Sequence, residues 1–162
     1  MIKGYIFDYG GTLDTAGCHW GQMLWAAYQR QLVPVSEQQF REAYVYGERT
    51  LGNEPIIRPD FTFYKTLAVK IRFQIEHLCT AGAWNAREAN FNDKHDAVLE
   101  DLYARVKTIT AHSREVLTKL HNQYPMVLVS NFYGNINTVL REFGLAKYFK
   151  DVIESAAVGI RK

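Results

Sequence analysis

Three short segments of the sequence carry polar residues whose types could act together. Asp8 opens the run DYGGTLD, the pair Ser130-Asn131 follows an apolar run, and Lys162 ends the run GIRK. A carboxylate such as that of Asp8 can attack phosphorus. A hydroxyl, backbone N–H groups and an ammonium can neutralise the charge that spreads over phosphoryl oxygens. If the fold brings these segments together, they form a candidate site for phosphoryl transfer.

The residues before these segments have the pattern of buried strands. The apolar run in 1–8 stops at a glycine pair, residues 126–129 (MVLV) are continuously apolar, and residues 151–154 (DVIE) form a third short run. Runs of this kind are typical of buried parallel strands. In an open α/β sheet the ligand lies at the carboxyl ends of the strands. The pattern therefore predicts that the polar segments meet at one edge of a parallel sheet.

Helical periodicity fills the stretches between the predicted strands. Four amphipathic helices are expected between residues 18 and 107, at 20–33, 37–46, 61–78 and 94–107. Ser36 and Gln39 resemble a capping box for the second of these helices, and Asp60 is expected to cap the third. Two further helices are expected at 113–124 and at 135–143, and Gly144 stops the latter.

This order of elements predicts the fold class. Strand, helical insertion, helix, strand, helix and strand is the pattern of an α/β protein with a Rossmann-like parallel-sheet core. The insertion after the first strand is expected to be an all-helical bundle that forms a cap. We assign residues 1–16 and 108–162 to the core and residues 17–107 to the helical cap domain.

The composition of the sequence limits the kinds of molecule that we expect the chain to bind. Hydrophobic residues make up 48% and charged residues 22% of the 162-residue sequence, and the formal net charge is +2. This balance is that of a globular protein and provides no strong field for nucleic acid or a membrane surface, so neither is expected as a partner. No apolar run is long enough to span a bilayer. With only Cys18 and Cys79, a disulfide framework is not expected, which favours a cytoplasmic protein.

The three polar segments, in this order and each at a strand end, resemble the haloacid dehalogenase-like (HAD) hydrolase superfamily. The helical stretch also matches the cap of that family in place and size, so the resemblance covers the whole chain. It implies that Asp8 is a nucleophile that forms an aspartyl-phosphate and also a ligand of Mg²⁺. It implies in addition that Gly10 offers its backbone carbonyl to the metal.

The same resemblance assigns the residues that would bind the phosphoryl group. Ser130 and the backbone amide of Asn131 would bind a phosphoryl oxygen. Thr12 would lie with them, bonded to the nucleophile or holding its loop. Lys162 would be the cation that separates the phosphate charge from that of Asp8. The substrate implied is a small phosphorylated molecule.

Two departures from the family pattern change what can be carried over. Most phosphatases of the family have a second Asp, the general acid, where this sequence has Gly10. His19 is the nearest titratable residue that could replace it. Family members also continue past the lysine to an acidic pair that completes the Mg²⁺ site. The sequence is therefore interpreted as the N-terminal part of such a hydrolase. We expect very slow or undetectable hydrolysis by this chain, weak Mg²⁺ binding, and association or swapping through the open strand edge near 152–154.

Three functions remain open at this point. The first is a Mg²⁺-dependent phosphatase of a small phosphorylated metabolite, with the aromatic-rich cap selecting the substrate. The second is a metal-free hydrolase of the 2-haloacid dehalogenase type, which also uses an Asp nucleophile and a Ser-Asn pair, but which usually has an aromatic residue at the position of Gly10. The third is a non-catalytic protein that binds a phosphorylated ligand or has a regulatory role.

Overall fold

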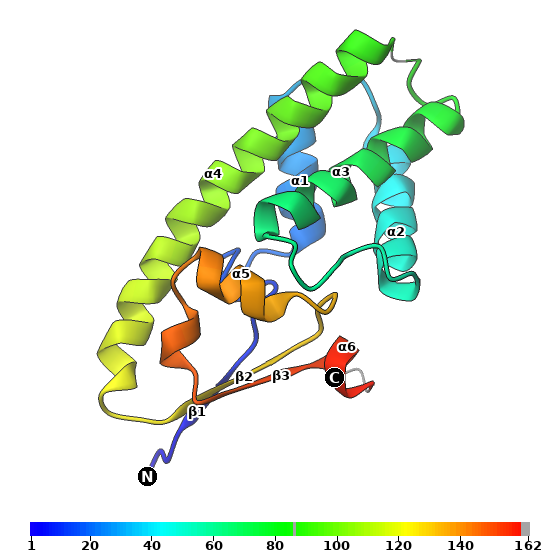
Figure 1. Ribbon diagram of the computed structural model, residues 1–162. Coiled ribbons are helices and arrows are strands. Elements are labelled where there is room, and N and C mark those ends of the chain that lie inside the picture. Colours follow the sequence, from blue (N-terminus) through cyan, green and yellow to red (C-terminus); the bar gives the residue numbers. More distant parts are fainter. Residues whose placement is uncertain (86, 160–162) are drawn as a thin grey trace.

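The computed structural model describes residues 1–85 and 87–159, and it is an α/β fold (Figure 1). Strands β1 (Tyr5–Phe7), β2 (Met126–Ser130) and β3 (Asp151–Glu154) form a parallel sheet in the order β1-β2-β3. The parallel sheet predicted from the apolar runs is thus confirmed. Strand β1 is shorter than the expected run in 1–8.

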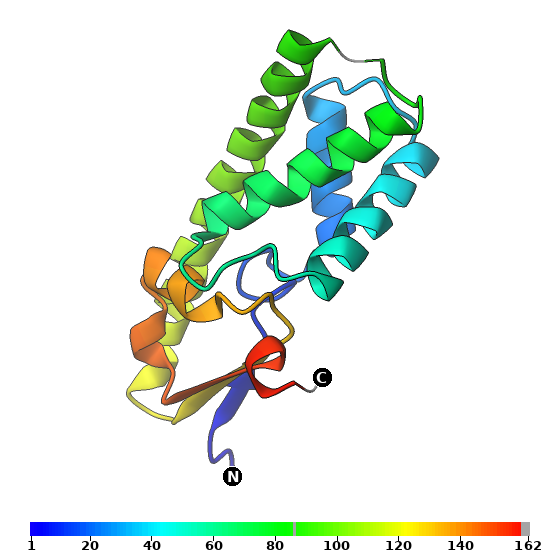
Figure 2. The same cartoon turned by 45° about the vertical axis from the view of Figure 1, so that its right-hand side comes forward.

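A bundle of four helices is inserted between β1 and β2, as the periodicity predicted. The helices are α1 (Trp20–Arg30), α2 (Glu37–Asn53), α3 (Phe63–Thr80) and α4 (Glu88–His121). The carboxyl ends of the strands point toward this bundle (Figures 1 and 2). The fold thus places the bundle over the sheet edge where the polar segments end.

The helix starts show which local signals were correct. The capping box of α2 is present, because the Ser36 hydroxyl accepts the N–H of Gln39 and the Gln39 side chain accepts the N–H of Ser36. The expected cap of α3 is wrong. Thr62, not Asp60, accepts the N–H of Lys65, and Asp60 instead binds Arg58.

Helix α4 corrects a second prediction. Separate helices were expected at 94–107 and 113–124, but α4 is one continuous helix of 34 residues. At the expected break, the hydroxyls of Thr108 and Thr110 donate to the carbonyls of Ala104 and Val106 at 3.1 and 2.8 Å. Such bonds to carbonyls of the preceding turn give the hydroxyl of a threonine within a helix a hydrogen-bond partner. The boundary assigned between residues 107 and 108 therefore lies inside α4.

Helix α5 (Ile136–Glu142) and the 3₁₀ turn η1 (Ala146–Tyr148) lie on one face of the sheet (Figure 1). The short helix α6 (Ser155–Val158), which the sequence did not predict, follows the carboxyl end of β3. Met126 and Leu128 are buried in one core with Leu117 of α4 and Leu140 of α5. Gly144 follows α5 with a left-handed φ of 68°, as expected of a residue that stops a helix.

The opposite face of the sheet carries apolar side chains, two of which are exposed, together with the exposed Asp151. Ile6 and Ile153 project from it and are 77% and 40% exposed. Register pairs Ile6 with Val127 and Ile153 with Val129, so these four side chains share one face. Association or swapping through the strand edge near 152–154 remains a prediction.

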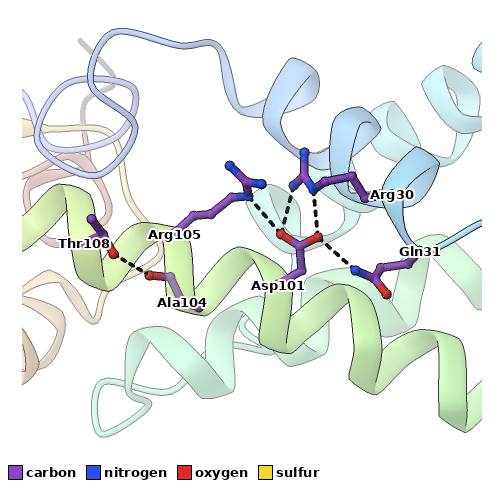
Figure 3. A network of polar contacts seen from close by, with 6 residues as sticks. All are labelled: Arg30, Gln31, Asp101, Ala104, Arg105 and Thr108. Carbon is purple, nitrogen blue, oxygen red and sulfur yellow. Dashed lines mark hydrogen bonds and ion pairs between the residues drawn. The ribbon is translucent and has the colours of Figure 1, made fainter.

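A network of ionic hydrogen bonds joins α1 to α4 (Figure 3). The carboxylate of Asp101 accepts from Arg30 Nε at 2.8 Å, from Gln31 Nε2 at 3.0 Å and from Arg105 Nε at 2.9 Å. These donors, Arg30 first, hold the pKa of Asp101 well below its usual range. The network fixes the first helix of the insert against the helix that continues into the core.

Within the described part of the chain, every helix is too short or too polar to cross a membrane.

Candidate functional site

Two of the predicted site residues meet at the carboxyl ends of β1 and β2. Asp8 follows β1, and Ser130 is the last residue of β2. The Ser130 hydroxyl donates to Asp8 Oδ1 at 3.0 Å, across 122 residues of sequence, and the N–H of Tyr9 donates to the same oxygen at 2.8 Å. Ser130 is buried and Asp8 is partly buried. The two bonds fix the orientation of the Asp8 carboxylate.

The other predicted residues lie around this pair. Gly10 and Asn131 line a cavity between the sheet edge and the helical insert. Thr12 is exposed on the turn after β1, where its N–H donates to the carbonyl of Tyr9 at 3.1 Å. Lys162 lies outside the described residues. The structure therefore brings Asp8 and Ser130 into direct contact and places Gly10 and Asn131 at the cavity beside them.

The loop after β1 is held by a carboxylate that the sequence did not single out. Asp14 is fully buried, and it accepts the N–H of Gly11 at 2.8 Å and the indole N–H of Trp20 at 2.9 Å. Gly11 adopts a left-handed φ of 85°, which glycine tolerates at no steric cost. Burial raises the pKa of Asp14 to about 7, against the opposing effect of the bonds from Trp20 and Gly11. Asp14 thus joins the loop that carries Asp8 to the first helix of the insert.

A second buried carboxylate holds the loop after β2. Glu154, opposite Ser130 in the register of the sheet, is 5% exposed and accepts the N–H of Gly134 at 2.6 Å. Burial raises its pKa, while bonds from the backbone of Gly134, Ile136 and Asn135 act in the other direction. The backbone that follows Ser130 and Asn131 is therefore fixed to the end of β3. The only signal of this role of Glu154 in the sequence is that an acidic residue ends the strand predicted at 151–154.

The cavity at the sheet edge has a volume of about 230 Å³. The core contributes Gly10, Gly11 and the loop 131–133, and the insert contributes aromatic and charged side chains. The side chains that the insert contributes include those of His19, Trp20, Tyr44, Glu48, Phe63 and Lys70. A concave site with apolar walls and a few convergent polar groups is typical of small-molecule binding.

An ion pair is built into the wall of this cavity. Lys70 Nζ lies 2.8 Å from Glu48 Oε1, and the hydroxyl of Tyr133 donates to Glu48 Oε2 at 3.0 Å. Lys70 is 8% exposed, and its ammonium lies 5.7 Å from the centre of the Trp20 ring. Burial alone would lower the pKa of Lys70, but Tyr133 and Glu48 outweigh it and hold the pKa above its ordinary value. Lys70 is therefore a protonated cation whose charge is balanced by Glu48.

His19 lies at the same cavity but is engaged as a helix cap. Its Nδ1 accepts the N–H of Gly21 at 3.1 Å, and its ring meets that of Tyr44 edge to face at 6.2 Å. Accepting this bond requires the lone pair of Nδ1, so the ring proton lies on Nε2. In this arrangement His19 can donate a hydrogen bond into the cavity.

Oxygen ligands for a metal are few in the described part of the chain. The resemblance assigns the Asp8 carboxylate and the Gly10 carbonyl, and hard oxygen donors of this type suit Mg²⁺. No cluster of three or more His, Cys, Asp or Glu side chains occurs among residues 1–85 and 87–159. The Asp14 carboxylate, the nearest in sequence, is occupied by Gly11 and Trp20.

Comparison with known proteins adds no family assignment. No protein-family model matches the chain, and no curated protein matches its sequence. The structure establishes a three-stranded parallel sheet with a four-helix bundle inserted between β1 and β2.

Proposed function

We propose that the chain carries the phosphoryl-transfer site of an HAD-like hydrolase, a phosphatase that acts on a small phosphate ester through an aspartyl-phosphate. The observation that carries the proposal is the contact between Asp8 and Ser130 at the carboxyl ends of two adjacent parallel strands. The residues to which we give these two roles, Asp8 and Ser130, are held next to each other by the sheet, beside a cavity.

In this proposal each residue has a defined step. A carboxylate oxygen of Asp8 attacks phosphorus, the bond from phosphorus to the ester oxygen breaks, and that oxygen takes a proton from water and leaves as the alcohol. The Ser130 hydroxyl and the Asn131 N–H bind phosphoryl oxygens, and water then hydrolyses the aspartyl-phosphate. Lys162, outside the described residues, would be the balancing cation.

Mg²⁺ would be held by the Asp8 carboxylate and the Gly10 carbonyl, with water and the substrate as further ligands. When bound, it would offset the negative charge that phosphate and Asp8 bring together. The chain's own part is to keep Asp8 oriented, through Tyr9 and Ser130, whether or not the ion is bound.

A non-catalytic phosphate-ester binder is the second candidate, and Gly10 is the observation that favours it. A Cβ built at Gly10 meets no described atom within 4 Å, so the place of a second acid is open space. Such a protein would bind the phosphate ester through Ser130 and Asn131 without hydrolysing it.

The test is phosphate release from p-nitrophenyl phosphate by the 162-residue chain with Mg²⁺, beside chloride release from 2-chloropropionate. Metal-dependent phosphate release supports the proposal. Chloride release without phosphate release would identify a dehalogenase instead. Binding of inorganic phosphate, detected calorimetrically with neither release, would identify the non-catalytic binder.

Replacing Gly10 by Asp is expected to raise kcat for esters with poor leaving groups by about 10- to 100-fold, because a general acid contributes about that much or more. The open space at Gly10 accepts the side chain. Phosphate release from an alkyl phosphate and from p-nitrophenyl phosphate is compared in the variant and in Gly10→Asn, which has the same size without the acid. An equal gain for both substrates or in both variants would contradict a missing acid at residue 10.

A further inference from the structure

The charged wall of the cavity contains a donor and an acceptor side by side. Lys70 Nζ and Glu48 Oε1 are 2.8 Å apart, and the other oxygen of Glu48 accepts from Tyr133. Lys70 comes from α3, Glu48 from α2, and Tyr133 from the loop that follows Ser130 and Asn131. The group therefore spans the insert and the core at the same cavity as Gly10.

Stability alone does not account for this pair. Removing two charges from water costs about as much as their attraction returns, and apolar side chains of similar volume are often as stable. Leu67 and Phe63, on the same helix as Lys70, show that this wall accepts apolar residues. A buried ion pair at the wall of a ligand-sized cavity is thus better explained by the ligand that it contacts.

We propose that Lys70 and Glu48 bind hydroxyl groups of the leaving alcohol, so that the substrate is the phosphate ester of a small uncharged polyol or monosaccharide. This inference rests on the proposed phosphatase function. A hydroxyl accepts from an ammonium and donates to a carboxylate, so it matches both partners at once. A second anionic group on the ligand would be repelled by Glu48. A hydrocarbon would leave the remaining N–H groups of Lys70 and the remaining lone pairs of Glu48 without a hydrogen-bond partner.

Size and the apolar walls agree with this class of alcohol. The cavity volume of about 230 Å³ is below the range of about 300–1,000 Å³ that is common for drug-sized ligands. The rings of Trp20 and Phe63 line the cavity beside the ion pair. Carbon-bound hydrogens of a polyol or sugar can pack on such rings while its hydroxyls reach Lys70 and Glu48.

The first experiment compares three esters with the same number of carbons: glycerol 1-phosphate, propyl phosphate and 3-phosphoglycerate. Binding is measured calorimetrically to the Asp8→Asn chain, which keeps the cavity and cannot turn over, with and without Mg²⁺. We expect glycerol 1-phosphate to bind at least about 10-fold more tightly than either of the others. A site built for a hydroxyl rejects propyl phosphate, which lacks one, and Glu48 repels the carboxylate of 3-phosphoglycerate. Phosphate release by the wild-type chain should follow the same order.

The second experiment removes only the negative charge, in Glu48→Gln. Lys70 then lacks its counter-charge, and the preference should shift toward 3-phosphoglycerate by about 10-fold or more. Glu37→Gln is the matched control, because Glu37 lies on the same helix and forms an exposed pair with Arg41. Circular dichroism checks that each variant folds. If Glu48→Gln does not fold, the double variant Lys70→Met with Glu48→Leu replaces it, and glycerol 1-phosphate should then lose its advantage over propyl phosphate.

The outcomes separate the two proposals. Equal binding of the three esters, or no change of preference in the variant, overturns the assignment of a polyol or sugar ester and leaves the phosphatase proposal intact. If neither the esters nor inorganic phosphate bind, the phosphatase proposal itself fails, and this inference falls with it.

Discussion

Asp8→Asn is expected to abolish phosphate release, lowering kcat by about 10³-fold or more, because the amide cannot form the covalent bond to phosphorus. The fold should persist. An asparagine oxygen can still accept from the N–H of Tyr9 and from the Ser130 hydroxyl, the two partners of Asp8 Oδ1. Phosphate release under single-turnover conditions and the thermal unfolding midpoint are the two measurements.

Asp151→Asn is the control for this variant. Asp151 also accepts the N–H of the residue that follows it, Val152, at 2.9 Å, but it is exposed at the amino end of β3, the opposite end of the sheet from Asp8. Its replacement should leave kcat within about twofold, since surface substitutions have small effects. Activity of the Asp8 variant within tenfold of wild type would remove Asp8 from its role as nucleophile.

The second large effect concerns stability and pH. The pKa of Asp14 is raised from 3.8 to about 7 in the folded chain, so between these values the folded state binds more protons than the unfolded state. The free energy of unfolding must therefore fall as pH rises. From pH 4.5 to 7.5 this single group lowers it by about 3 kcal/mol.

Asp14→Asn should remove that part of the pH dependence. Urea unfolding at pH 4.5 and 7.5 gives the free energy of unfolding for each form, and the fall between the two pH values should be smaller in the variant. Asp101→Asn is the control, because the pKa of Asp101 is held far below this range and the group stays ionised throughout. That variant should be less stable at both pH values with an unchanged difference between them. An unchanged difference in Asp14→Asn would show that Asp14 does not titrate in this range.

Short-range signals predicted most of the fold. The capping box at Ser36 depends only on residues three positions apart, and the apolar run of β2 is typical of a central parallel strand. The break expected within α4 was wrong because tertiary packing there outweighs local propensity. Thr108 and Thr110 weaken the helical pattern, yet both bond to the preceding turn of α4, and packing of the helix against the core extends it through them.

The candidate site was predictable only where the sheet defines it. Asp8 and Ser130 could be brought together from the sequence because both follow parallel strands. Glu48 and Lys70 could not, since their contact depends on how α2 packs on α3. One signal was present: Lys70 falls on the same buried stripe of α3 as Leu67 and Ile71. A lysine on an apolar stripe predicts a buried partner but does not identify it.

Helix α4 makes the connection between insert and core rigid on one side. At 1.5 Å per residue, its 34 residues span about 51 Å without interruption. A sharp bend would have to break backbone hydrogen bonds of the helix, whereas the other crossing, at Ala16 and Gly17, is a turn with left-handed backbone. The insert is thus joined to the core by one continuous helix on one side and by a turn on the other. A wide opening between the insert and the core would therefore have to bend α4, whereas a small rotation of the insert needs only a change in the backbone of the 16–17 turn.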